Sequence, residues 1–289
     1  MEKARVNDVE LEYEVKGSGE PVLLIPTGPI ADSFWPFLME DALAARYQLI
    51  AYHQRGQAGS SRTPPPVSFA EHAADAKGLL DYLGIRRAHI AGHSTGAITA
   101  LQLALDYPES VHSLALLETP LMSVAGATAF VEKVGPSVAI YSAGKPEEAI
   151  AEFISAVCSL EWEECSRLID KHTPGGTLQV FGDADNVFST LLPELGKWQF
   201  GPEQAAILAQ PVLSVIGTDS ERLFRESDEM LQAWFPQIED CRIEGVAHLL
   251  HLQRPESVVQ GVGAFFARHP MSSRESGSAN RAVGARSGE

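Results

Sequence analysis

Short apolar runs alternate along the chain with segments that have the length and spacing of helices. Residues 9–15 alternate apolar and polar positions, as in a half-exposed strand. Nearly continuous apolar runs occur at 21–26, 47–52, 86–92, 111–118 and 211–217. We also predict a last strand at 240–245. The helix-like segments between and after them are 33–46, 68–83, 95–107, 224–235 and 255–268. Buried runs of this kind are typical of strands covered by helices on both faces. The pattern therefore predicts an α/β fold with a doubly wound, mainly parallel sheet.

One long segment interrupts this alternation. Residues 119–205 contain helix-like stretches but no buried-strand run, and they are too many for a loop in a compact domain. We therefore predict a core formed by 1–118 and 206–269, with 119–205 as a mostly helical lid over the carboxyl edge of the sheet. Residues 270–289 are rich in Ser, Gly and Arg, and we expect them to be a disordered tail.

Composition and charge narrow the classes of function. The chain has 38 acidic and 22 basic residues and a formal net charge of −16, which argues against a nucleic-acid partner. It contains no apolar run long enough to span a bilayer and no apolar segment near its start, so we expect a cytoplasmic protein with no membrane partner. Its three cysteines lack zinc-site spacing, and we expect neither a metal nor another cofactor. We expect a monomer or a homodimer.

The first candidate for chemistry is a serine between a predicted strand and a predicted helix. Gly92-His93-Ser94-Thr95-Gly96 has the pattern G-x-S-x-G. At such a strand-to-helix turn a serine takes a strained backbone conformation, and glycines are needed because a Cβ atom would clash. The start of the following helix also directs N–H groups at the site. These features favour Ser94 as a nucleophile.

A serine nucleophile needs a base within hydrogen-bond reach. Among the histidines, His248 follows the predicted strand at 240–245 and precedes the last helix, which places it at the carboxyl edge of a parallel sheet. We therefore predict that His248 is the base, with His251 as the alternative.

These motifs together resemble those of α/β-hydrolase fold enzymes with a lid, over residues 9–268. Besides the serine motif, YHQRGQAGSS at 52–61 is similar to the family's Y-D-x-R-G-x-G-x-S loop, and VAHLLHLQRPE at 246–256 is similar to its region around the catalytic histidine. Among the departures from the pattern, His53 stands where Asp is usual and Ala247 where Gly is usual. The resemblance implies the α/β-hydrolase fold and a triad in the order serine, acid, histidine.

The acid of the triad is less easily placed. The common family pattern puts it three residues after the glycine that ends the strand following the lid, and Ser220 occupies that position here. Glu118 ends the buried run 111–118, where a charge is costly unless it is paired or functional. A minority of the family, including the fungal zearalenone lactonases, places the acid there. We predict Glu118 as the acid and keep Asp219 as the alternative.

Acyl transfer also needs donors for the oxyanion that forms on the attacked carbonyl. The backbone N–H of Thr95 is the first donor that we predict. The second should come from the loop after 21–26, where Pro26 and Pro29 have no N–H. Thr27 or Gly28 remains, and the family resemblance points to Gly28.

The sequence favours a carboxylic ester hydrolase that acts on a small hydrophobic ester or lactone. Ser94 would attack, His248 would move the proton, and Gly28 and Thr95 would hold the oxyanion. Because the nucleophile is serine, epoxide hydrolases and haloalkane dehalogenases, which use a carboxylate, are disfavoured. Two alternatives remain open. One is a cofactor-free haloperoxidase, perhydrolase or carbon–carbon bond hydrolase on the same fold, and the other is a binding protein that retains the triad. Aromatic lid residues that could face the substrate are Phe130, Tyr141, Phe153, Trp162, Phe181, Phe188, Trp198 and Phe200.

Overall fold

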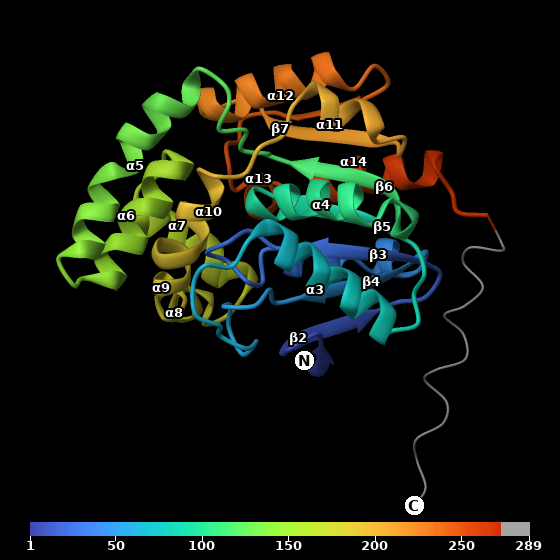
Figure 1. Cartoon of the computed structure of the whole chain (residues 1–289), viewed down its shortest axis with the longest axis horizontal. Coiled ribbons are helices and arrows are strands. Elements are labelled where there is room, and N and C mark those ends of the chain that lie inside the picture. Colours follow the sequence, from blue (N-terminus) through green and yellow to red (C-terminus); the bar gives the residue numbers. More distant parts are fainter. Residues whose placement is uncertain (273–289) are drawn as a thin grey trace, which may run out of the picture.

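An eight-stranded sheet is the centre of the computed structural model, which describes residues 1–272 (Figure 1). In chain order its strands are β1 (Glu2–Val6), β2 (Val9–Lys16), β3 (Glu20–Ile25), β4 (Tyr47–Tyr52), β5 (Ala88–His93), β6 (Val111–Leu117), β7 (Val212–Gly217) and β8 (Glu239–Ile243). Their order across the sheet is β1-β2-β4-β3-β5-β6-β7-β8. β2 pairs antiparallel with β1 and β4, and the pairs from β4 to β8 are parallel. The predicted α/β fold with a mainly parallel sheet is confirmed.

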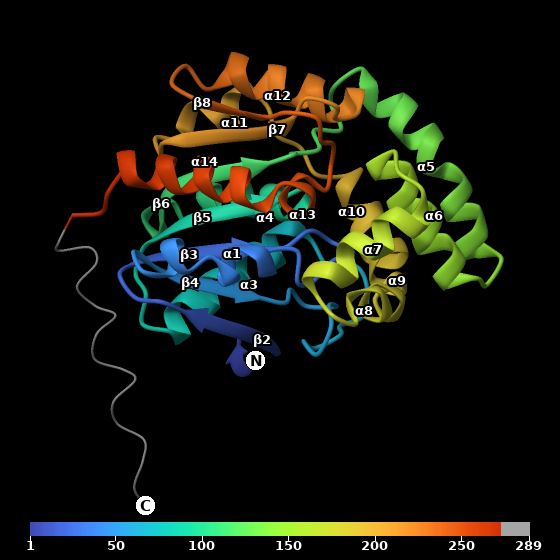
Figure 2. The same cartoon turned by 180° about the vertical axis from the view of Figure 1, so that it is seen from behind.

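Helices cover both faces of this sheet. One layer contains α3 (Phe69–Tyr82), α4 (Thr95–Asp106) and α12 (Arg222–Trp234), and the other contains α1 (Trp35–Met39), α2 (Asp41–Ala44) and α14 (Pro255–Arg268), as Figures 1 and 2 show from opposite sides. Successive residues of β3 point to different layers. Leu23 and Ile25 join the core beneath α3 and α4, whereas Val22 and Leu24 pack beneath α1 and α14. All four side chains are fully buried, which explains the continuous apolar run in the sequence.

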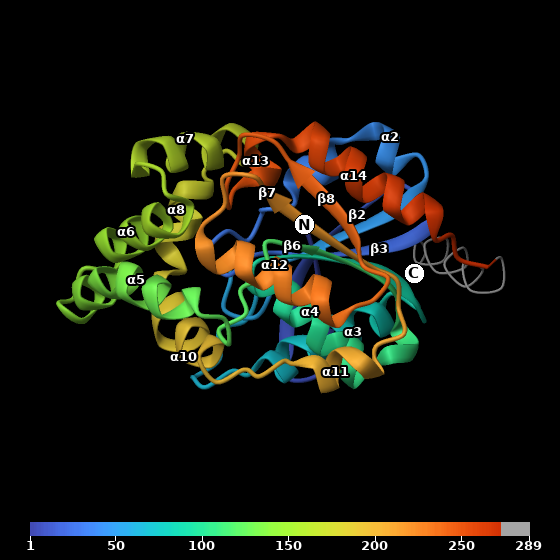
Figure 3. The ribbon, with the colours of Figure 1, turned by 90° about the horizontal axis from the view of Figure 1, so that it is seen from above.

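Between β6 and β7 lies the helical insertion, a name we use for residues 126–195. Its elements are α5 (Gly126–Ser142), α6 (Pro146–Cys158), α7 (Trp162–His172), α8 (Gly176–Gly182), α9 (Ala184–Asn186), the π-helical turn η2 (Val187–Leu191) and α10 (Leu192–Leu195). In the view from above, these helices lie together at one end of the sheet (Figure 3). The next helix, α11 (Pro202–Ile207), packs against the core of the sheet and not in the helical insertion. Phe200, just before it, and Ala205 within it belong to the core beneath α3 and α4.

The structure departs from the predicted elements in a few places. β1 is an additional strand, in which only Ala4 and Val6 are buried. The helix expected over 33–46 is divided into α1 and α2, because Glu40 between them has extended backbone angles. Short elements not anticipated separately are the 3₁₀ turn η1 (Pro108–Ser110) and α13 (Leu250–Gln253).

The predicted tail begins at Pro270, and its residues from 273 onward lie outside the described part of the chain. Of its first three residues, Met271 is buried. None of the helices within residues 1–272 is both long and apolar enough to cross a membrane.

Candidate active site

Ser94 lies in a sharp turn between β5 and α4. Its φ of 56° and ψ of −121° are unusual for a residue with a side chain. A Cβ atom at Gly92 would come 2.3 Å from the carbonyl oxygen of Gly96, and one at Gly96 would come 2.3 Å from that of Ile25. The Ser94 N–H donates to the Leu117 carbonyl at 2.8 Å, which ties the turn to β6. The two glycines therefore allow the close packing that the turn requires.

His248 lies in the loop between β8 and α13, and three contacts fix its position. Its ring stacks on Phe224 with centroids 4.2 Å apart, and its carbonyl oxygen accepts from Nε2 of His93 at 2.9 Å. Its Nδ1 is 3.5 Å from Oε2 of Glu118, a long contact. Within residues 1–272 no hydrogen bond joins the Ser94 hydroxyl to His248, although both residues line the same cavity. Contacts of this kind are often long in a free enzyme and shorten once substrate is bound.

Glu118 follows β6 directly and is 2% exposed. Its Oε1 accepts from the Gly217 N–H at 2.8 Å and from the Ser220 hydroxyl at 2.5 Å, which leaves Oε2 toward His248. Asp219 is exposed, and its carboxylate accepts from the Thr218 hydroxyl at 3.3 Å. The structure thus places Glu118, and not Asp219, beside His248. Ser220, at the position where the acid is more usual, holds Glu118 instead.

Burial sets the protonation of this pair. It raises the pKa of Glu118 to about 7, because the charged carboxylate loses its hydration, and the two hydrogen bonds to Oε1 only partly oppose this effect. It lowers the pKa of His248 to about 3 by the same loss of hydration of the imidazolium. At mildly alkaline pH the pair therefore consists of a carboxylate and a neutral imidazole, which is the state in which a histidine can act as a base.

The alternative base, His251, is fully buried and does not line the cavity. Its ring lies against those of His93 and Phe34, with centroids 4.1 and 6.0 Å away. Neither of its ring nitrogens has a hydrogen-bond partner within residues 1–272. His251 is therefore part of the packing behind the site.

The loop that carries Gly28 faces the start of α4. The Gly28 N–H donates to Oγ1 of Thr95 at 2.9 Å, so the second predicted oxyanion donor is already in use in the free protein. Thr27 donates to Oγ of Ser33 at 3.3 Å. The N–H of Thr95 belongs to the first turn of α4, where backbone donors have no partner within the helix. It lies next to Ser94, and no acceptor for it is found within residues 1–272.

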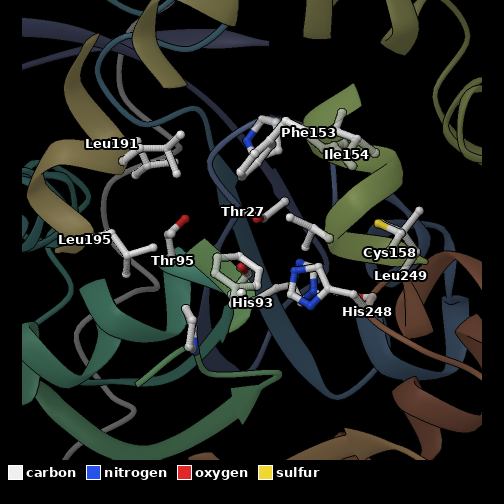
Figure 4. A pocket seen from close by; sticks show the side chains of 17 residues that line it. Thr27, His93, Thr95, Phe153, Ile154, Cys158, Leu191, Leu195, His248 and Leu249 are labelled. Carbon is white, nitrogen blue, oxygen red and sulfur yellow. Dashed lines mark hydrogen bonds between the residues drawn. The ribbon is translucent and has the colours of Figure 1, made fainter. Parts of the chain in front are cut away.

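A cavity lies between these loops and the helical insertion, and about 530 Å³ of space, part of it open to solvent, is unoccupied by atoms there (Figure 4). No charged side chain lines it, and its surface is mainly apolar. The lining residues are Thr27, Pro29, Ile30, His93, Ser94, Thr95, Pro120, Phe130, Phe153, Ile154, Val157, Cys158, Leu191, Leu192, Leu195, His248 and Leu249. Among the lid aromatics anticipated from the sequence, only Phe130 and Phe153 line it, and the leucines of η2 and α10 supply much of the remaining wall.

Asp183 and Gln179 fasten the helical insertion to the core. Asp183 is 2% exposed and accepts from the Ala58 N–H at 2.7 Å and from the Arg62 guanidinium. Gln179 accepts from the Ala31 N–H at 3.1 Å and donates to Asp183 at 2.5 Å. The insertion is therefore attached both to the loop after β3 and to the loop after β4.

The family profile described as alpha/beta hydrolase fold matches residues 20–161, the part of the chain that contains Ser94 and Glu118. Together with the solved structures described below, this match shows that the chain has the α/β-hydrolase fold. Within residues 1–272, no group of three or more His, Cys, Asp or Glu side chains is arranged to hold a metal ion.

Several known proteins are similar to this chain in sequence or in fold. The putative carbamate hydrolase RutD of Azorhizobium caulinodans is 41% identical over 117 residues, which are 40% of this chain and 44% of the relative. The match thus spans less than half of the curated relative. A thermophilic esterase from Thermogutta terrifontis has a TM-score of 0.78 at 20% identity, covering 93% of this chain and 100% of that one. The enol-lactonase of Burkholderia xenovorans LB400 has a TM-score of 0.75 at 18% identity, covering 92% and 100%. At these identities the solved structures establish the shared fold.

Two buried glutamines beside the candidate site were not singled out from the sequence. Gln54 donates to the Pro26 carbonyl at 3.0 Å, and Gln57 donates to the carbonyls of Thr27 and Gly28 at 2.8 and 2.6 Å. Both belong to the motif at 52–61, at positions where the family pattern is variable. Their contacts with the loop after β3 could be found only from the structure.

Proposed function

We propose that the protein is a serine hydrolase that cleaves a carboxylic ester or lactone through an acyl-enzyme on Ser94. One observation carries this proposal: Ser94, at a strained strand-to-helix turn, shares an apolar cavity with the imidazole of His248. A buried carboxylate, Glu118, lies behind that imidazole at Nδ1. These positions support the roles of nucleophile, base and acid that we propose for Ser94, His248 and Glu118.

In the proposed reaction, Oγ of Ser94 attacks the carbonyl carbon while Nε2 of His248 takes its proton. Glu118 holds the hydrogen on Nδ1, so Nε2 is free to accept, and it stabilises the imidazolium that forms. The N–H of Thr95 donates to the oxyanion. His248 then protonates the leaving alkoxide. It next removes a proton from a water molecule as the water oxygen attacks the acyl carbon. The bond from this carbon to Oγ of Ser94 then breaks, His248 returns the proton to Oγ, and the acid leaves.

The cavity supports a neutral, hydrophobic substrate. Because no charged side chain lines it, a carboxylate or ammonium on the substrate would be desolvated without a partner, which is costly. Phe130, Phe153 and Leu191 instead offer apolar contact to an acyl or alcohol group. The fold shared with an esterase and an enol-lactonase agrees with this class of substrate.

Labelling with a small fluorophosphonate, followed by intact-mass spectrometry, tests the proposal. The wild-type protein should take up one adduct, Ser94→Ala should take up none, and Ser123→Ala, which changes an exposed serine, should label like the wild type. Turnover of p-nitrophenyl butyrate should follow the same pattern and exceed that of a singly charged succinate half-ester. A folded wild-type protein with neither adduct nor turnover would contradict the proposal and favour a binding protein.

A further inference from the structure

The peptide between Thr27 and Gly28 is held in a single orientation by buried side chains. Gln57, which is 1% exposed, donates from one amide nitrogen to the carbonyls of Thr27 and Gly28. In a trans peptide the N–H points away from the carbonyl of the same unit. The Gly28 N–H is therefore directed away from Gln57, toward the start of α4.

At the start of α4 that N–H meets the Thr95 hydroxyl and not open space. Oγ1 of Thr95 accepts from Gly28 at 2.9 Å, and no acceptor for the hydroxyl's own hydrogen is recorded within residues 1–272. Thr95 also lines the cavity, and Figure 4 shows its side-chain oxygen turned into it. A hydroxyl that accepts from an N–H on one side is polarised as a donor on the other.

We infer that the Thr95 side chain is itself an oxyanion donor, so that Thr95 contributes both its backbone N–H and its hydroxyl to the site. Gly28 then acts through Thr95: its N–H fixes Oγ1, and the hydroxyl hydrogen is delivered to the oxyanion that forms beside Ser94. This inference rests on the proposed function. It changes the role predicted for Gly28 from a direct donor to a group that positions the donor.

The alternative is that Thr95 turns away when substrate binds and releases the Gly28 N–H to the oxyanion. Thr95→Ala distinguishes the two, because it removes the hydroxyl and leaves no side-chain atom in front of Gly28. Thr95→Ser keeps the hydroxyl. Thr190→Ala is the matched control, because Thr190 is also buried (4% exposed, against 6% for Thr95) but does not line the cavity.

The measurement is kcat and KM for p-nitrophenyl butyrate, with far-ultraviolet circular dichroism and Tm to establish that each variant folds. We expect Thr95→Ala to lower kcat by about 10²-fold with little change in KM, since losing one oxyanion donor costs about that much. Thr95→Ser and Thr190→Ala should stay within a few-fold of the wild type. If Thr95→Ala does not fold, Thr95→Val replaces it, and it should lose kcat to the same extent.

Unchanged or higher kcat in Thr95→Ala, or an equal loss in Thr95→Ser, would overturn the inference. The first result would make Gly28 the direct donor, and the second would show that the methyl group matters and not the hydroxyl. A wild-type protein without turnover or adduct would instead refute the proposed function. The two failures are therefore distinguishable.

Discussion

Replacing Glu118 by Gln tests the assignment of Glu118 as the acid of the triad, because the two side chains have almost the same size and shape. The Glu118 carboxylate has one oxygen on the Gly217 N–H and the Ser220 hydroxyl and the other toward His248. A glutamine that keeps its carbonyl oxygen on Gly217 must turn its NH₂ group toward Nδ1. His248 would then carry its hydrogen on Nε2, where it cannot accept the proton of Ser94.

The size of the effect follows from the position of the charge. Oε2 of Glu118 is 3.5 Å from Nδ1 of His248, and both groups are buried. Two unit charges about 4 Å apart attract by about 4 kcal/mol at an effective dielectric constant of about 20. This attraction exists only when the imidazolium forms, so its loss raises the barrier and not the binding energy. At about 1.4 kcal/mol for each factor of ten, kcat should fall about 10³-fold.

Steady-state kinetics on p-nitrophenyl butyrate measure this change, with Asp219→Asn as the matched control. Asp219 is exposed and contacts Thr218, so its variant should keep kcat within a few-fold of the wild type. KM should change little in either variant. A loss of less than about tenfold in Glu118→Gln, or a larger loss in Asp219→Asn, would refute the assignment of the acid.

Three further results are expected from the same site. Because burial raises the pKa of Glu118 to about 7, wild-type kcat/KM should be low in acid and rise with pH through about 7, whichever member of the pair holds the proton; a midpoint near 4 would contradict this. Adding Ser220→Asp to Glu118→Gln should restore kcat by at least about tenfold, and Ser220→Asn should not, since only the aspartate returns a charge near His248. Gln57→Glu should lower the free energy of unfolding, measured in urea, by about 1–3 kcal/mol, because two buried carbonyls lose their hydrogen-bond donor. The control Gln260→Glu, at an exposed position, should leave this free energy nearly unchanged. Equal stability of the two variants would contradict this explanation.

The elements of the core could be predicted because each buried strand gives a continuous apolar run. β3, β5 and β7 are almost wholly buried, and their predicted ranges differ from the observed ones by one or two residues. β1 gave no such run, because in a five-residue edge strand only Ala4 and Val6 face the core. The division between α1 and α2 was also unpredictable, since it rests on the backbone angles of Glu40.

In the candidate site, chain position was informative wherever a residue ends a strand or begins a helix. Ser94 and Glu118 both follow buried strands directly, and β5 and β6 are neighbours in the sheet. The role of Gln57 could not be predicted, because a polar loop residue has no periodic pattern and its partners are carbonyls about 30 positions away. The leucines of η2 and α10 were missed because the folded positions of these two short elements determine which leucines line the cavity.

The loop after β4 has contacts in two directions. Gln54 and Gln57 of this loop donate to backbone carbonyls of the loop after β3, whereas Ala58 and Arg62 donate to Asp183 of the helical insertion. In the proposed reaction, the cavity wall formed by the helical insertion and the groups that donate to the oxyanion would therefore be held by the same loop. A bound substrate large enough to separate Asp183 from Ala58 would then also disturb the oxyanion donors. Discrimination between substrates by size would therefore change kcat rather than the affinity for substrate.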